Sequence, residues 1–301
     1  MKLLLTFILT STLITVQAQT KADSIKLIQQ SVDLLDLDFT DAEADSMLGS
    51  INSNYQLYKA MHRTLPTNDI TFPFAFNPAP AGTKIPKKQL RIYWDVPTQT
   101  ELPSDKNELA FYSIPQLASL IMNKKISSVE LTKFFIARLK KWDDTLEAVI
   151  TLTEELALKQ AKKADDELKA GIYRGPLHGI PYGLKDLFAV KGYKTTWGTT
   201  PYMDQVLDVD SYVYTELKNH GAVLCAKLSL GALAYNNKWF GGETKNPWNL
   251  SQGSSGSSAG SAAAVTAGLL PFAIGTETLG SIVSPSTRCG ATGLRPTFGT
   301  V

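Results

Sequence analysis

The stretch GSSGSSAGS at residues 253–261 runs directly into the apolar sequence AAAV at 262–265. Glycine and serine alone are typical of a flexible linker, but a linker does not normally lead straight into an alanine-rich helix. A phosphate-binding loop is excluded, because no Gly-Lys-Ser/Thr follows. The stretch therefore predicts a Gly/Ser loop at the N-terminus of a helix over 258–268, with hydroxyl and N–H groups pointing toward one place.

Two other segments combine backbone freedom with reactive side chains. In HGIPYGLKD at 178–186 an apolar strand ends in Lys185, and its glycines and proline allow another segment to approach closely. In GTETLGSIVSP at 275–285 a strand ends and a tight turn places Ser281 at its tip, where backbone N–H groups can converge. Taken singly, a lysine at a strand end is usually a solvated surface residue, and such a turn is more often a simple connection.

The second half of the chain alternates between strand and helix patterns. Short apolar runs at 177–184, 222–228 and 269–275 predict strands, and helices are expected at 208–219 and 258–268. Strands that alternate with helices favour an α/β fold in which helices cover both faces of a sheet.

The first half has a different texture. Apolar residues at helical spacing predict helix over 19–63, and seven prolines then predict an extended loop over 64–105. Helices are expected to begin at Ser113 and at Ser128, and another should cover 153–170.

The N-terminus predicts export. Lys2 precedes a short apolar run over 3–16, and Val16-Gln17-Ala18 places small residues at the −3 and −1 positions of a cleavage site. The alternative is a membrane anchor, but the run is shorter than the roughly 20 residues that a bilayer needs. We expect a signal peptide over 1–18, cleaved after Ala18, and a periplasmic or secreted protein without stable membrane insertion.

Charge and cysteine content exclude several classes of function. The net charge of +2 gives no electrostatic reason to bind nucleic acid. Cys225 and Cys289 lie in apolar or glycine-rich contexts, which indicates buried free thiols even though export permits a disulfide. No cluster with metal-ligand spacing is evident, so neither a metal nor another cofactor is expected.

Together the three segments resemble the amidase signature family. The family has a Gly/Ser stretch, a Gly-Asp-Thr-Gly-Gly-Ser-Ile-like turn and an upstream lysine after Gly-Ile-Pro. The spacing from Ser257 to Ser281 is 281 − 257 = 24 residues, which matches the family register. Further matches are GAVL at 221–224, NPWN at 246–249 and CGATGLRPT at 289–297, so the resemblance covers roughly 110–301.

The resemblance implies a serine amidase with a Ser-Ser-Lys relay. Ser281 would be the nucleophile, Ser257 a bridge preceded by a cis peptide bond, and Lys185 a base that burial keeps neutral. The implied oxyanion hole consists of backbone N–H groups of Thr278, Leu279, Gly280 and Ser281. The expected reaction is hydrolysis of a small-molecule amide or peptide amide through a Ser-acyl intermediate.

The resemblance also implies a domain organisation. We expect a helical and proline-rich extension over 19–105 and an α/β/α amidase domain with a mixed, twisted central sheet over 106–301. This domain is expected to be incomplete, because family members continue beyond the motif near Val301. Two alternatives are a glutamyl-tRNA amidotransferase A-like subunit, against which the leader argues, and an inactive truncated relic.

The sequence departs from the family pattern near the site. Glycine positions hold Ser255, Ala259 and Leu279, Glu277 replaces the usual aspartate, and Val283 stands where an arginine is common. The backbone of Leu279 still offers its N–H, although its side chain adds bulk. We expect these changes to alter substrate choice more than activity.

Overall fold

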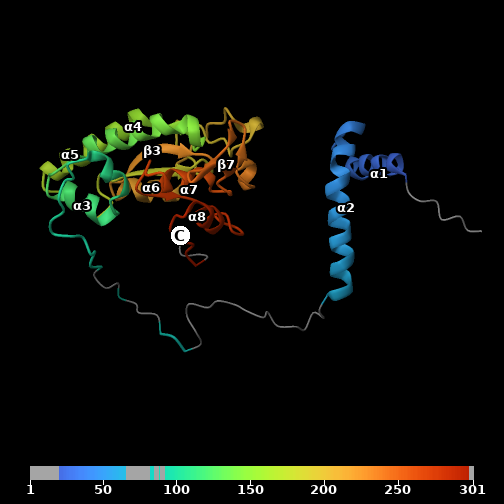
Figure 1. Ribbon diagram of the computed structural model, residues 1–301, viewed down its shortest axis with the longest axis horizontal. Coiled ribbons are helices and arrows are strands. Elements are labelled where there is room, and N and C mark those ends of the chain that lie inside the picture. The colour runs from blue at the N-terminus through green and yellow to red at the C-terminus, as the bar shows by residue number, and fades with distance from the viewer. Residues whose placement is uncertain (1–19, 66–81, 85–87, 89–91, 298–301) are drawn as a thin grey trace, which may run out of the picture. The chain divides into compact units, whose positions relative to one another are not determined.

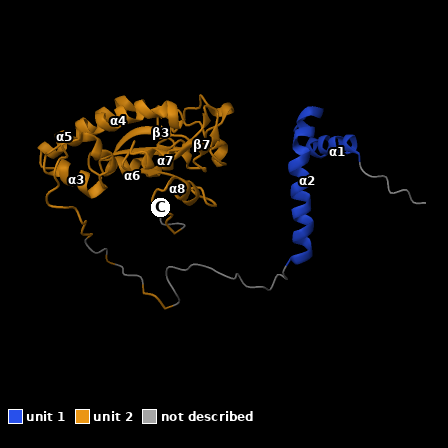
Figure 2. Ribbon diagram, viewed as in Figure 1, with its two compact units in different colours: residues 1–80 blue, residues 81–301 orange. Residues whose placement is uncertain are grey.

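The computed structural model describes residues 20–65, 82–84, 88 and 92–297 (Figure 1). The expected signal peptide lies outside these residues, as do residues 66–81, 85–87 and 89–91 of the loop predicted over 64–105. The chain divides into two compact units, Met1–Pro80 and Ala81–Val301 (Figure 2). The expected boundary between residues 105 and 106 stays a prediction.

The described part of the first unit consists of two helices, α1 (Lys21–Asp33) and α2 (Asp41–Thr64). Helix was predicted without a break over 19–63, and this was wrong for the residues between α1 and α2. The chain turns at Asp36, whose φ is 57°, and a new helix then starts at the N-cap Thr40. The capping box between Thr40 and Glu43 satisfies N–H groups at that start.

The second unit is built on a four-stranded sheet with the order β1-β3-β2-β8. Its strands are β1 (Val149–Leu152), β2 (Pro181–Lys185), β3 (Val223–Leu228) and β8 (Ala273–Ile274). β2 runs parallel to β3 and β8, whereas β1 is antiparallel to β3. The sheet is mixed, as expected, and the predicted α/β fold class is confirmed.

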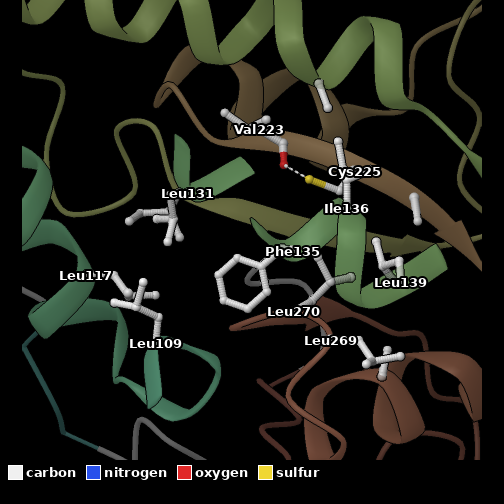
Figure 3. Packing of buried hydrophobic residues seen from close by; sticks show 14 of the residues in the cluster. Leu109, Leu117, Leu131, Phe135, Ile136, Leu139, Val223, Cys225, Leu269 and Leu270 are labelled. Carbon is white, nitrogen blue, oxygen red and sulfur yellow. Dashed lines mark hydrogen bonds between the residues drawn. The ribbon is translucent and has the colours of Figure 1, made fainter. Parts of the chain in front are cut away.

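Helices pack against both faces of this sheet. The helices of this unit are α3 (Ile114–Met122), α4 (Ser128–Leu146), α5 (Glu154–Lys169), α6 (Tyr212–Asn219), α7 (Ala259–Thr266) and α8 (Val283–Cys289), of which α8 packs on α7. The larger core cluster joins α3, α4 and α7 to β3 (Figure 3). A smaller cluster packs Tyr214 of α6 against Tyr182 and Leu184 of β2. Val223 and Cys225 of β3 belong to the larger cluster and Leu224 to the smaller one. Successive strand residues point to opposite faces, so the two clusters lie on opposite sides of the sheet.

Several elements differ from the sequence-based expectation. β1 was not predicted, nor were the hairpin of β4 (Lys238–Trp239) with β5 (Gly242–Glu243) and that of β6 (Lys245–Asn246) with β7 (Asn249–Gly253). Three of these strands have only two residues, too short for a periodic pattern. Also unpredicted were α8 and the 3-10 turns η1 (Lys106–Phe111), η2 (Thr200–Tyr202) and η3 (Ala232–Ala234).

Two adjacent serines at the start of α4 have different roles. Ser127, rather than the predicted Ser128, is the N-cap, and its Oγ accepts a hydrogen bond from the Glu130 N–H at 3.1 Å. The buried Ser128 Oγ instead donates to the carbonyl of Gly179 at 2.8 Å. This bond ties α4 to the segment just before β2.

The cysteine prediction is confirmed: Cys225 and Cys289 are free and buried. Burial raises the pKa of the Cys289 thiol to about 11 and raises that of Cys225 as well, so neither forms a thiolate readily. Across the described ranges, we find no helix whose length and apolar character would let it cross a bilayer.

Candidate active site

Lys185 is the last residue of β2, and its side chain is fully buried. The Nζ atom donates to Ser257 Oγ at 2.7 Å, to Thr276 Oγ1 at 2.8 Å and to Ser258 Oγ at 3.1 Å. All three of these acceptors are neutral hydroxyls. Burial lowers the pKa of Lys185 from 10.5 to about 7, because a charged amine is poorly solvated there. The lysine can therefore accept a proton near neutral pH.

Ser257 lies in the Gly/Ser loop just before α7 and is also buried. The Gly256–Ser257 peptide bond is cis, as the family resemblance implied. Gly256 has a steric reason to be glycine, since a Cβ there would lie 1.8 Å from the carbonyl oxygen of Asn236. The carbonyl of Ser257 accepts a hydrogen bond from the Gly231 N–H at 3.3 Å.

Ser281 is linked to the site of Lys185 and Ser257 through its backbone. Its carbonyl accepts the N–H of Ser258 at 3.0 Å. Ser258 Oγ accepts the N–H of Thr276 and donates to the Thr276 carbonyl, both at 3.1 Å. Ser258 thus joins the Gly/Ser loop to both ends of the turn over 276–281. The structure brings all three predicted residues together, Lys185 and Ser257 by direct contact and Ser281 through this backbone link.

The turn that carries Ser281 is held by the buried carboxylate of Glu277. Its Oε2 accepts the N–H groups of Ile282 at 2.8 Å and Val283 at 2.9 Å, and its Oε1 pairs with Arg295 at 2.8 Å. Burial alone would raise the pKa of Glu277, but the N–H groups of Val283, Ile282 and Gly280 and the guanidinium of Arg295 lower it to about 2. The carboxylate is therefore ionised and fixed.

The predicted oxyanion-hole N–H groups fall into two sets, one with a hydrogen-bond acceptor and one without. The Gly280 N–H interacts with the Glu277 carboxylate. Within residues 92–297, the N–H groups of Thr278, Leu279 and Ser281 have no hydrogen-bond acceptor. Unpaired N–H groups at a turn can receive an anionic oxygen.

Sequence reasoning missed two groups of residues beside Lys185. Ser258 and Thr276 contact its amine directly, and both lie within the motifs already singled out. The second group is a buried ion pair between Asp186 and Lys227, 2.6 Å apart and fully inaccessible to solvent. A lysine inside the apolar strand over 222–228 was the available signal, because a buried lysine needs a partner.

A buried lysine of lowered pKa, bonded to a serine and adjoining a turn with free N–H groups, defines an α/β protein with a serine–lysine site. Residues 130–301, more than half of the chain, match the family model Amidase. The chain belongs to the amidase family.

Relatives and solved structures agree with this membership. The chain is 46% identical over 193 residues to the glutamyl-tRNA(Gln) amidotransferase A-subunit of a Marinomonas species, covering 63% of this chain and 39% of that protein. It is 38% identical to the structure of a peptide amidase from Stenotrophomonas maltophilia, with a TM-score of 0.59, covering 63% of this chain and 41% of that one. A fatty acid amide hydrolase structure is 31% identical with a TM-score of 0.58, covering 62% and 33% respectively. The chain therefore spans about two fifths of the length of the first two.

Proposed function

We propose that this protein hydrolyses the carbon–nitrogen bond of an amide through a Ser281-acyl intermediate. The observation that carries the proposal is the 2.7 Å contact between the buried Lys185 amine and Ser257 Oγ. Family membership supports the reaction class, since the matching solved structures include a peptide amidase.

In the proposed reaction the proton moves along the relay. Ser281 Oγ attacks the amide carbon while its proton passes to Ser257, and Ser257 gives its own proton to neutral Lys185. The N–H groups of the turn over 278–281 stabilise the resulting oxyanion. Breakage of the C–N bond then returns the proton through Ser257 to the leaving amine. Water attacks the ester along the same path, which releases the acid and restores Ser281.

Small amides or peptide amides are the proposed substrates. The Stenotrophomonas peptide amidase supports this class, because its structure is 38% identical to this chain over the matched part. Chemistry supports it as well, since a neutral lysine and a serine bridge need no metal ion to activate Ser281. The net charge of +2 supports a small-molecule partner over a nucleic acid.

The test is hydrolysis of a simple anilide by the full protein, together with labelling by a fluorophosphonate. Ser281→Ala and Lys185→Met should each lower the hydrolysis rate on the order of 10³-fold or more, because relay members act as a unit. Ser284→Ala is the matched control: Ser284 is exposed, one helical turn further on, and its Oγ contacts Ser255 Oγ at 2.8 Å. A Ser281→Ala protein that keeps a tenth of the activity would refute the relay.

A second candidate is a component of an aminoacyl-tRNA amidotransferase. The observation that favours it is the 46% identity to the A-subunit of glutamyl-tRNA(Gln) amidotransferase, higher than the 38% to the peptide amidase. Such a component would work with partner chains and charged tRNA. Hydrolysis of free amides by the purified protein alone would favour the amidase, and no labelling of Ser281 at all would favour an inactive relic.

We also propose that the protein is exported. The support is the basic start, the short apolar run and the small residues before position 19. Export would separate the protein from tRNA and so argues against the second candidate. N-terminal sequencing of the protein from its host should find Gln19 as the first residue, whereas an intact Met1 would overturn the proposal.

A further inference from the structure

Two lysines are buried at the ends of neighbouring parallel strands. Lys185 ends β2, and Lys227 is the last residue but one of β3. In the strand register Lys227 pairs with Leu184, and Lys185 pairs with Leu228. Paired residues share a face and successive residues alternate. The two lysine side chains therefore start from opposite faces of the sheet, next to each other along the same pair of strand ends.

Their surroundings differ in charge. The amine of Lys185 contacts hydroxyl groups at 2.7–3.1 Å. The amine of Lys227 lies 2.6 Å from a carboxylate oxygen of Asp186 and also donates to the Lys194 carbonyl at 2.6 Å and to Thr195 Oγ1 at 2.9 Å. The only carboxylate adjacent to Lys185 in the chain is thus already paired with the other lysine.

Asp186 is held in that arrangement from three sides. Its backbone N–H donates to the Leu228 carbonyl at 2.9 Å, which extends the β2–β3 ladder by one residue. Its Oδ2 accepts the N–H of Thr196 at 2.7 Å, while the opposite carboxylate oxygen faces Lys227. The buried Asp186 carboxylate is therefore paired with Lys227 on one oxygen and with a backbone N–H on the other.

We propose that Lys227 is a positioning residue for the relay, which balances the Asp186 carboxylate so that Lys185 remains a neutral base. Without Lys227, the Asp186 carboxylate would lose its cation, and Asp186 follows Lys185 directly in the chain. An anion that close favours the protonated amine, and a protonated Lys185 has no lone pair with which to accept a proton. This inference rests on the proposed role of Lys185 as the base.

The other charged groups around the two lysines are already balanced. The turn that packs on Lys185 contributes Glu277, which pairs with Arg295 and with N–H groups of α8. The loop beside Lys227 contributes the side chain of Lys194, which pairs with Asp204 at 2.7 Å on the surface. The Gly/Ser loop contributes only hydroxyls to Lys185. Asp186 and Lys227 are therefore the charges whose removal should change the protonation of Lys185.

The experiment measures the protonation of Lys185 directly. Lysine labelled with ¹³C and ¹⁵N is incorporated into the full protein, and the side-chain NMR signal that disappears in Lys185→Met is followed during a pH titration. Lys227→Met should raise the pKa of Lys185 by about one unit, because it leaves an anion nearby. Asp186→Asn should shift it in the opposite direction, because it leaves a cation. The double variant, Asp186→Asn with Lys227→Met, should return it close to the wild-type value.

Opposite shifts of the Lys185 pKa in the two single variants, which cancel in the double variant, distinguish an electrostatic role of Lys227 from a purely structural one. Loss of packing alone would move both single variants in the same direction and would not be repaired in the double variant. Lys227→Arg, which keeps the charge, is the matched control and should leave the titration of Lys185 near wild type. If Lys227→Met does not fold by circular dichroism, Asp186→Asn and the double variant still decide the sign. Equal titration of Lys185 in all folded variants would overturn the proposal.

The same titration keeps this inference separate from the proposed function. If Ser281→Ala retains activity while the NMR shifts occur as expected, the relay fails and the charge balance stands. If Ser281→Ala is inactive and the Lys185 signal does not shift, the relay stands and Lys227 has no positioning role. In the active protein, the pH of half-maximal hydrolysis should shift in the same direction as the NMR titration.

Discussion

The amine of Lys185 and the hydroxyl of Ser257 lie 2.7 Å apart although 72 positions separate them in the chain. The lysine comes from the end of a strand, and the serine from the loop before a helix that packs on the same sheet. Burial of the amine lowers the pKa of Lys185, because the charged form is poorly solvated there. The contact with Ser257 places this amine where it can accept the serine proton.

The rate of amide hydrolysis should depend on pH through Lys185. Its pKa of about 7 means that the neutral, basic form grows as the pH rises through 7. We therefore expect the hydrolysis rate at low substrate concentration to rise with pH and to level off about one to two units above that value. A profile that stays flat from roughly pH 5 to pH 9, with the protein folded throughout, would contradict a lysine base.

The stability of the fold should also depend on Lys185. Its pKa is about 7 in the folded protein and about 10.4 in an unfolded chain. Between these values the unfolded state binds the extra proton, so the free energy of unfolding should rise with pH across this window. Urea unfolding at several pH values measures this slope. Lys185→Met should have a smaller slope than the wild type, and identical slopes would show that the amine is not buried as described.

Glu277→Gln should destabilise the turn that carries Ser281. The carboxylate accepts hydrogen bonds from two N–H groups at the start of α8 and pairs with Arg295, and all three contacts stabilise its negative charge. Its pKa is lowered to about 2 from 4.5, so its contribution is present above pH 4.5 and is lost as the pH falls through 2. We expect a loss of about 1.5–3 kcal/mol at neutral pH.

The matched control for Glu277 is Glu101→Gln. Glu101 also pairs with a cation, Lys125 at 3.1 Å, but its side chain is 85% exposed. A surface pair of this kind contributes at most about 1 kcal/mol. Urea denaturation of both variants makes the comparison, and equal losses would show that burial of Glu277 has no energetic consequence.

Gly260→Ala should be strongly destabilising. A Cβ at this position in α7 would lie 2.3 Å from the carbonyl oxygen of Ala148 and 2.6 Å from the N atom of Ser229, both backbone atoms that cannot move aside alone. We expect a cost of about 1–3 kcal/mol or more from the displaced helix, and a lower rate of hydrolysis because Ser257 and Ser258 lead into α7.

Gly49→Ala provides the same substitution in an open position. Nothing lies within 4 Å of a Cβ at Gly49 in α2, so the change should stabilise that helix by up to about 1 kcal/mol. All five tryptophans lie at or beyond position 94, so tryptophan fluorescence reports only on the second unit. The fluorescence-detected unfolding midpoint should fall in Gly260→Ala and stay unchanged in Gly49→Ala. A rise in Gly49→Ala would mean that the two units unfold together.

The motif residues of the site could be predicted from the sequence because the residues next to each of them indicate its local structure. The Gly/Ser stretch before an apolar helix indicated a loop at a helix start, and α7 begins at Ala259. The apolar run before Lys185 indicated a strand, and β2 ends at that lysine. Strand and helix periodicity are properties of neighbouring residues, so they can be seen in the sequence.

The sequence missed elements whose stability comes from distant partners. β1 is an edge strand that forms because it pairs with β3, 74 to 79 positions further along the chain. The two-residue strands of the hairpins are too short to show a period. The N-cap of α4 lies one residue earlier than predicted, because the Ser128 hydroxyl donates to the Gly179 carbonyl instead of capping the helix. Both differences arise from contacts that local pattern does not contain.

The chemical groups of this protein could be recognised without any structure: a lysine, two serines and a glycine-rich turn in the order of the amidase family. The electrostatic state of these groups, in contrast, depends on the folded arrangement. Whether a lysine is neutral or charged depends on how deeply it is buried and on which carboxylate it faces, and Lys185 and Lys227 differ in the second respect although both are buried. Solvation and charge pairing act through space, and the fold sets those distances.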